Sequence, residues 1–207
     1  TFITEDANRS EMVQHVYDVT YGTVRPNEDT LVVIDDSIVR GTTLKESIVR
    51  MLSRLKPKRL LILSSAPQIR YPDCYGIDMS KLGDFIAFRA AIELLKDNNQ
   101  EALLTQIYDC CKELQRNNQL HKEYMVKQVY KPFTPEQISK KIGELIPPPE
   151  VTTPVDLIFQ TIEDLHESCP TNTGDWYFTG NYPTPGGNRV VNQAFINYME
   201  GKNVRGY

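Results

Sequence analysis

Two continuous apolar runs dominate the first third of the chain, and neither shows the alternation of a half-exposed strand. Residues 30–34 read Thr-Leu-Val-Val-Ile, and residues 59–65 read Arg-Leu-Leu-Ile-Leu-Ser-Ser. Parallel strands that are covered on both faces have this pattern, because neither face of such a strand meets water. The two runs therefore predict two buried strands.

The segment between these runs has the spacing of a helix. Its apolar positions are Leu44, Ile48, Met51, Leu52 and Leu55. Pro57 follows, where a helix is expected to end. A strand, a helix and a second strand form a right-handed βαβ unit. The predicted fold class is therefore α/β with a parallel sheet.

Helical patterns continue over residues 81–96, 100–115 and 134–146. The last of these begins with Thr134, Pro135 and Gln137, which predict a capping box with proline at the first helical position. Residues 155–159 fit either a short strand or the start of a helix that runs through Leu165. From Cys169 onward, Gly, Asn, Pro and aromatic residues predict little regular structure apart from a short helix at residues 192–200.

Charge and composition narrow the classes of function. The 207 residues carry a net charge of −4 at pH 7, so a general nucleic-acid role, which needs a basic face, is not expected. No apolar stretch approaches the ~20 residues of a membrane span, and no signal peptide is seen. We therefore expect a soluble, cytoplasmic protein without a nucleic-acid or membrane partner. The four cysteines have no zinc-ligand spacing.

Candidate chemistry lies directly after the first apolar run. Asp35 and Asp36 stand at the C-terminal end of the predicted strand, which is the edge where α/β sheets bind ligands. Gly41 allows the backbone to approach a ligand closely, and Thr42 and Thr43 precede a helix. The free N–H groups at a helix start favour an anion. The loop therefore predicts a site for a phosphorylated ligand.

With its Ser-Ile-Val-Arg insert before Gly-Thr-Thr, this loop resembles the phosphoribosyl pyrophosphate (PRPP) loop of type I phosphoribosyltransferases, and within them the glutamine PRPP amidotransferase (amidophosphoribosyltransferase) family. Three further stretches carry the resemblance in the family's order. They are residues 1–3 (Thr-Phe-Ile), residues 66–72 (Ala-Pro-Gln-Ile-Arg-Tyr-Pro) with 75–79 (Tyr-Gly-Ile-Asp-Met), and residues 178–184 (Phe-Thr-Gly-Asn-Tyr-Pro-Thr). The match is close over residues 1–87 and resumes in pieces between residues 133 and 184.

The resemblance implies a site and a reaction. Asp35 and Asp36 are implied to contact the ribose hydroxyls of PRPP and Mg²⁺, as the catalytic and metal-binding residues. The PRPP-binding loop is implied to comprise Asp35, Asp36, Ser37, Ile38, Val39, Arg40, Gly41, Thr42 and Thr43, the part from Ser37 onward surrounding the 5′-phosphate. Arg70 and Asp78 are candidates for lining the same site. PRPP, glutamine and water would become 5-phosphoribosylamine, glutamate and pyrophosphate, the first step of purine synthesis.

The resemblance also implies how the chain is divided and what it works with. Residues 1–96 would be the C-terminal part of the phosphoribosyltransferase domain, residues 97–150 a helical insertion, and residues 151–207 a C-terminal extension. A glutaminase domain that supplies ammonia, and the loop that grips pyrophosphate, would precede Thr1, so the fragment alone would be inactive. Purine nucleotide inhibitors and a homo-oligomer of the full-length protein are expected.

Some members of the family hold an iron–sulfur cluster on cysteines, and at those positions this chain has Asp73, Thr171, Gly174 and Tyr177. Mg²⁺ without a cluster is therefore the expected cofactor. Two other functions stay open. One is a non-catalytic module that senses PRPP or a nucleotide, and the other is a salvage phosphoribosyltransferase, which should show a hood for its base and lack residues 178–184.

Overall fold

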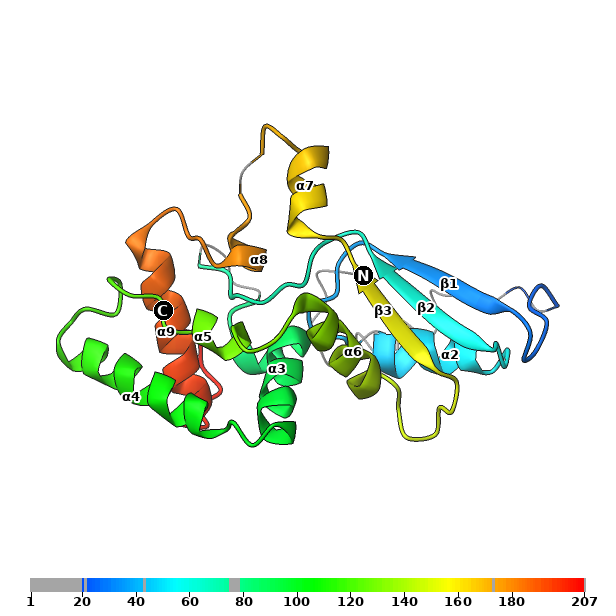
Figure 1. Ribbon diagram of the computed structural model, residues 1–207, viewed down its shortest axis with the longest axis horizontal. Helices are drawn as coiled ribbons and strands as arrows, with labels where there is room; N and C mark the ends of the chain where they lie inside the picture. Colours follow the sequence, from blue (N-terminus) through cyan, green and yellow to red (C-terminus); the bar gives the residue numbers. More distant parts are fainter. Residues whose placement is uncertain (1–19, 21, 43, 75–78, 173, 207) are drawn as a thin grey trace.

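The centre of the molecule is a parallel sheet. The structure, a computed structural model, describes residues 20, 22–42, 44–74, 79–172 and 174–206. Within them, β1 (Thr30–Asp35), β2 (Arg59–Ser64) and β3 (Val155–Phe159) pair in the order β1-β2-β3, all parallel (Figure 1). Val33 lies beside Ile62, and Ile62 lies beside Leu157. The α/β class with a parallel sheet is confirmed.

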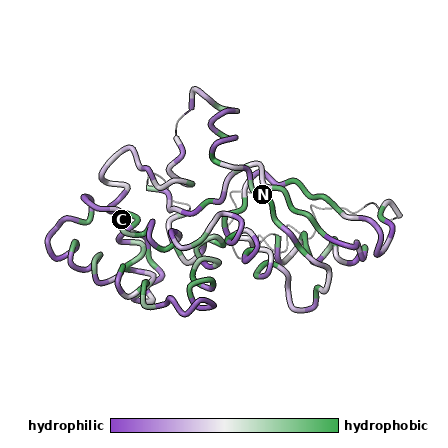
Figure 2. The backbone as a smooth tube through the Cα atoms, in the orientation of Figure 1, coloured by the Kyte–Doolittle hydropathy of each residue, from purple (hydrophilic) through white to green (hydrophobic). Residues whose placement is uncertain are grey.

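Only one face of this sheet is covered by the described residues. On that face Leu60, Ile62 and Leu157 are buried in one core with residues of the surrounding helices. On the other face Val32 is 50% exposed and Ile34 75% exposed, although the strands are largely hydrophobic (Figure 2). The expectation of cover on both faces is therefore not met within the described part of the chain.

Helices pack against the covered face. The predicted helix after the first strand consists of a π-helical segment, η1 (Leu44–Val49), and a short helix, α2 (Arg50–Ser53). Helix α6 (Pro135–Leu145) packs on both β3 and α3 (Ile86–Asp97). Its predicted capping box is present, because the Thr134 hydroxyl accepts from the Gln137 N–H and the Gln137 side chain accepts from the Thr134 N–H.

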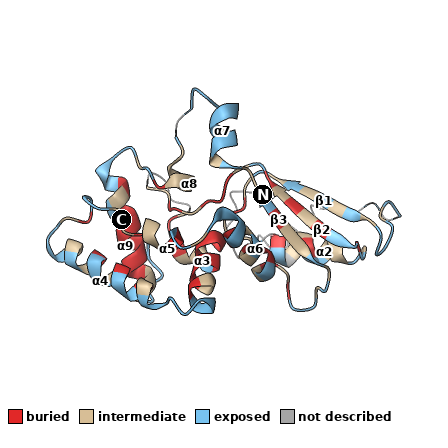
Figure 3. Cartoon of the chain, in the orientation of Figure 1, coloured by how far each residue is buried: buried red, intermediate tan, exposed pale blue. Residues whose placement is uncertain are grey.

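A second group of helices lies beside the part of the molecule that contains the sheet, and we call it the helical lobe (Figure 1). It contains α3, α4 (Ala102–Arg116), α5 (Lys127–Tyr130) and α9 (Pro185–Met199), and most of the buried positions of α3 and α9 face its interior (Figure 3). The predicted helix at residues 81–96 is interrupted, since Phe85 is extended between η2 (Leu82–Asp84) and α3. The predicted short helix at residues 192–200 is also longer, because it begins at Pro185.

One buried amide fixes the loop between α4 and α5. Asn192 of α9 is fully buried, and its Nδ2 donates to the carbonyl oxygens of Leu120 at 2.8 Å and Glu123 at 2.7 Å. Its Oδ1 accepts from the Met125 N–H at 3.2 Å. Residues between α4 and α5, for which the sequence offered no assignment, are thereby attached to the C-terminal helix.

The C-terminal third of the chain first adds β3 to the sheet and then forms short helices. After β3 come α7 (Ile162–Ser168) and the single turn α8 (Trp176–Thr179). Residues 155–159 are thus a strand, and a helix follows. The proposed boundaries at residues 96 and 150 stay a prediction. No helix in the described ranges has the length and apolar character needed to cross a membrane.

Candidate functional site

The acidic pair lies where the sequence predicts it, at the C-terminal edge of the sheet. Asp35 is the last residue of β1, and its carbonyl oxygen accepts from the Ser65 N–H at 2.9 Å. The Ser65 hydroxyl donates to the Asp36 carbonyl oxygen at 3.2 Å. These two hydrogen bonds connect the end of β1 to the first turn after β2. The sheet therefore fixes the position of Asp35 and Asp36. The role of Ser65 was not evident from the sequence.

Each carboxylate is oriented by the backbone that follows it. The Asp36 N–H donates to Asp35 Oδ1 at 3.1 Å, and the Ser37 N–H donates to Asp36 Oδ1 at 2.8 Å. Within the described part of the chain, the second oxygen of each carboxylate has no donor. Two oxygens, one from each residue, are left to accept hydroxyl groups or to coordinate a cation.

The electrostatics of the pair also suit a cation. Burial raises the pKa of the Asp35 carboxyl above its ordinary value, and the adjacent charge of Asp36 raises it further. A divalent cation would relieve this repulsion, and carboxylate oxygens are the ligands that Mg²⁺ prefers. The residues present therefore fit Mg²⁺. In the residues that the structure describes, His, Cys, Asp and Glu form no group of three or more suited to a metal.

The middle of the loop is anchored on the start of α3. Ile38 is buried, and the Val39 carbonyl oxygen accepts from the Ile86 N–H at 2.8 Å. The Arg89 guanidinium donates to the Arg40 carbonyl oxygen at 2.8 Å, and Arg40 Nε lies 3.8 Å from Asp84 Oδ2. The Arg40 side chain is therefore directed toward η2.

Gly41 closes the loop in the way the sequence predicts. Its φ of +71° is in the left-handed region, and a Cβ there would lie 3.4 Å from Ile86 Cγ1. Its carbonyl oxygen accepts from the Lys45 N–H at 2.9 Å, which starts the helical segment. Thr42 is exposed beside it, whereas Thr43 lies outside the described residues. The loop thus ends at a helix start, where an anion is favoured.

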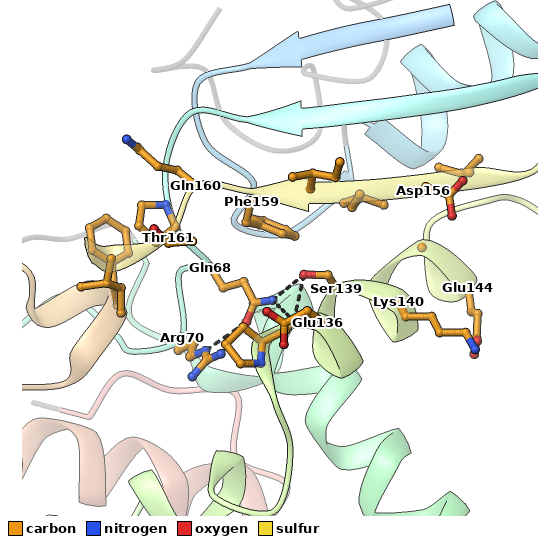
Figure 4. A pocket seen from close by; sticks show the side chains of 18 of the residues that line it. Gln68, Arg70, Glu136, Ser139, Lys140, Glu144, Asp156, Phe159, Gln160 and Thr161 are labelled. Atoms are coloured by element: carbon orange, nitrogen blue, oxygen red, sulfur yellow. Dashed lines mark hydrogen bonds between the residues drawn. The ribbon is translucent and has the colours of Figure 1, made fainter. Parts of the chain in front are cut away.

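Arg70 makes its contacts with Gln68 and with Tyr130 of α5. Its Nε and Nη2 donate to Gln68 Oε1 at 3.1 and 2.7 Å, and its guanidinium carbon lies 5.3 Å from the centre of the Tyr130 ring. It lines a groove of about 820 Å³ between β3 and α6 to which none of residues 35–43 contributes (Figure 4). The described residues show no contact between Arg70 and the acidic pair, and the lining of a common site by Arg70 stays a prediction. Asp78 lies outside the described residues.

Two stretches that carry the family resemblance meet in space. The Tyr177 carbonyl oxygen accepts from the N–H groups of Arg70 at 2.9 Å and Tyr71 at 3.1 Å. The Tyr182 hydroxyl donates to the Pro72 carbonyl oxygen. Residues 66–72 and the segment 177–182 thus form one packed unit beside the sheet edge.

Comparison with known proteins gives matches over part of the chain. No family model matches the chain. The amidophosphoribosyltransferase of Pasteurella multocida is 41% identical over 83 residues, which are 40% of this chain and 16% of that protein. That of Haemophilus influenzae is 46% identical over 61 residues (30% of this chain, 12% of that protein), and that of Saccharomyces cerevisiae 39% over 87 residues (40% and 17%). The chain is therefore similar to amidophosphoribosyltransferases over part of its length, and the matches span 12% to 17% of these relatives.

Proposed function

We propose that the chain is the C-terminal part of an amidophosphoribosyltransferase that binds PRPP at residues 35–43. The observation that supports it most directly is the acidic pair at the sheet edge, followed within one loop by a left-handed glycine and a helix start. The full-length enzyme would convert PRPP, glutamine and water to 5-phosphoribosylamine, glutamate and pyrophosphate. This reaction would place it at the first step of de novo purine synthesis.

The loop offers a partner for each end of the sugar phosphate. The free oxygens of Asp35 and Asp36 would accept the two ribose hydroxyls and hold Mg²⁺, which neutralises charge on the pyrophosphate when it is bound. The 5′-phosphate would lie over residues 37–43, with Gly41 allowing close approach and the helix start favouring the negative charge. Because Arg40 lies toward Asp84, its part in this proposal is to hold the loop on η2.

The chain's own residues would act by position and charge. As pyrophosphate leaves C1, the sugar gains oxocarbenium character, and two carboxylates beside the ribose stabilise positive charge there. Ammonia then attacks C1, so a protein nucleophile is not required, and a fixed ribose provides the orientation. The backbone bonds that orient the two carboxylates would maintain this geometry throughout the reaction.

The proposal extends to what surrounds the site in the full-length enzyme. A glutaminase domain in residues preceding Thr1 would supply ammonia, purine nucleotides would inhibit, and the enzyme would be a cytoplasmic homo-oligomer. An iron–sulfur cluster is not proposed. Asp73 and Tyr177 stand at two of the cluster positions, and neither supplies a thiolate.

The test uses the full-length enzyme with Asp35→Asn and Asp36→Asn. Each change removes a charge that faces the ribose, and we expect PRPP-dependent pyrophosphate release to fall by about a hundredfold or more, the order seen when one electrostatic stabiliser is removed. Glutamine hydrolysis without PRPP should persist at its basal level. Steady-state assays of both reactions provide the measurement.

Asp109→Asn is the matched control, because Asp109 is an exposed acid on α4, and it should leave both rates unchanged. Unaltered transferase kinetics in both site variants would contradict the assignment. Binding of PRPP or nucleotide by a full-length protein that never turns over would support a sensor, and transfer of the phosphoribosyl group to a free base would support a salvage enzyme.

A further inference from the structure

The outer edge of β3 is open in the described part of the chain. The Pro154 carbonyl oxygen accepts from the Leu60 N–H, and the Gln160 N–H donates to the Ser64 carbonyl oxygen. Because backbone groups alternate in direction along a strand, Leu157 and Phe159 direct their N–H and C=O groups away from β2. No described residue bonds to these groups. The edge therefore offers hydrogen bonds to a further strand.

This edge runs along the groove that contains Arg70, which we call the β3 groove. It measures about 820 Å³ and is lined on its apolar side by Pro67, Leu157, Phe159, Ile162 and Phe178 (Figure 4). Near Val155 it narrows, because Gly143 of α6 approaches the Val155 carbonyl oxygen so closely that a Cβ there would lie at 2.8 Å. The accessible part therefore begins at Leu157 and continues past Phe159.

A fixed cation stands at one end of the β3 groove. Gln68 is buried, and its Nε2 donates to the Pro135 carbonyl oxygen at 2.7 Å and to Ser139 Oγ at 2.8 Å. Its Oε1 in turn accepts both bonds from Arg70. No carboxylate of the described residues lies within 4.0 Å of the guanidinium nitrogens. Arg70 is thus held in place by neutral hydrogen-bond partners and forms no ion pair within 4.0 Å among the described residues, although its charge also acts on the Glu136 carboxylate nearby.

The charges along the groove give it a direction. Figure 4 shows Arg70 beside Gln68 and Glu136, on the side of the groove toward the C-terminal end of β3, whereas Lys140, Glu144 and Asp156 lie toward the opposite end. Asp156 pairs with Arg59 at 2.7 Å, and Glu144 pairs with Lys141. Glu136 and Glu163 also line the groove. The pKa of Glu136 is held below its usual range, first by its own N–H, then by the Thr134 hydroxyl at the start of α6, and in smaller part by the charge of Arg70. A strand that runs parallel to β3 would therefore end at the cation.

We propose that the β3 groove binds an extended peptide segment of a partner protein, which adds to β3 as a parallel strand and places its C-terminal carboxylate on Arg70. The open N–H and C=O groups of Leu157 and Phe159 would supply backbone hydrogen bonds, and the apolar side chains would accept alternate residues of the peptide. An antiparallel strand would instead bring its amino terminus to the guanidinium, which like charge disfavours. The inference does not depend on PRPP binding.

The probe is the peptide fluorescein-Gly-Lys-Val-Thr-Val-Thr-Val with a free C-terminal carboxylate. It is titrated with the full-length protein, and binding is followed by fluorescence anisotropy. The free acid should bind at least about tenfold more tightly than the same peptide as its C-terminal amide, because a charge-assisted hydrogen bond is lost in the amide. Arg70→Gln should remove that difference by weakening binding of the acid alone. Lys140→Gln, an equal change of charge at the other end of the groove, should retain it.

N-methylated probes test strand addition without altering the protein. Alternate amides of the peptide face β3, so methylation of one alternate set should abolish binding, and methylation of the other set should leave it unchanged. Equal binding of the acid and the amide, or equal binding of both methylated probes, would overturn the proposal. A dimer of the protein that the acid probe dissociates, seen by sedimentation, would also overturn it in favour of a second copy at this edge.

Discussion

At the scale of single residues, Gly180 shows how the segment after α8 packs against the loop between α4 and α5. Its φ is +71°, and it ends α8 in the left-handed conformation. A Cβ at this position would overlap the Tyr124 ring. Tyr124 is partly buried and packs edge-on against Tyr71 and Tyr182, with ring centres 5.4 Å and 6.2 Å apart. Two separate requirements, one of the backbone and one of the packing, therefore favour glycine at this position.

Gly180→Ala should consequently destabilise the protein by about 2–4 kcal/mol, the sum of left-handed strain and overpacking. Gly201 is the matched control, since its φ is +67° but no atom lies within 4 Å of a Cβ placed there. Gly201→Ala should therefore cost only the strain, about 1 kcal/mol. Urea unfolding of the two variants measures the difference, and equal losses would show that Tyr124 yields to the added methyl group.

Some features of the candidate site could be predicted from the local sequence and others could not. Asp35, Asp36 and Gly41 could be identified because a strand end, an acidic pair and a helix start are adjacent along the chain. The direction of Arg40 and the contacts of Arg70 could not be predicted. Arg40 is directed by its ion pair with Asp84. Arg70 is directed by Gln68, which is itself bonded to residues of α6. Contacts between residues so far apart in the chain leave no pattern in the sequence.

At the scale of elements, β1, β2 and the longer helices follow from hydrophobic spacing, whereas the pattern at residues 155–159 fits a strand or a helix equally. The misses have physical causes. The helix α9 was underpredicted because Pro185, Gly186 and Gly187 have poor helix propensity. Pro185 is nevertheless favourable in the first turn, and Gly187 lies so close to Tyr182 that a Cβ would overlap its ring. Tertiary packing thus keeps residues 185–187 in a helix, although their local propensity predicts a loop.

The capping box of α6 allows a test at this scale. Thr134→Ala removes the acceptor for the Gln137 N–H and should lower the free energy of unfolding by about 1 kcal/mol. Helix α6 is part of the core through Ile138 and Ile142, so the loss should appear in global unfolding monitored by circular dichroism.

Thr161 caps α7 in the same way, accepting from the Asp164 N–H at 3.0 Å, but α7 has no buried residue. Thr161→Ala should therefore change global stability by only a few tenths of a kcal/mol, the usual size of an effect away from the core. A larger loss at Thr161 than at Thr134 would mean that packing of α6 does not limit unfolding.

At the scale of the whole molecule, the sheet presents an apolar surface that the described residues leave open. Val32, Ile34 and Ile158 are each at least half exposed, and the register places them on one face with Leu61 and Leu63. A contiguous apolar surface of this kind marks a contact with further protein. It agrees with the proposal that more of the transferase domain precedes these residues in the full-length enzyme.

That proposal leads to an expectation for the 207 residues by themselves. The loop at residues 35–43 would hold the ribose and the 5′-phosphate, whereas the loop that grips pyrophosphate would come from preceding strands. With one of two anion-binding loops missing, hydrogen bonds to charged groups worth roughly 1.5–3 kcal/mol each are absent, and so is the orientation of C1. Assayed with PRPP, Mg²⁺ and a high concentration of ammonia, the isolated fragment should release pyrophosphate at least about a hundredfold more slowly than the full-length enzyme, since two such bonds correspond to that factor. The full-length enzyme with ammonia as nitrogen donor is the control, because it removes any need for the glutaminase domain. Turnover of the fragment at a comparable rate would show that the whole transferase site lies within residues 1–207.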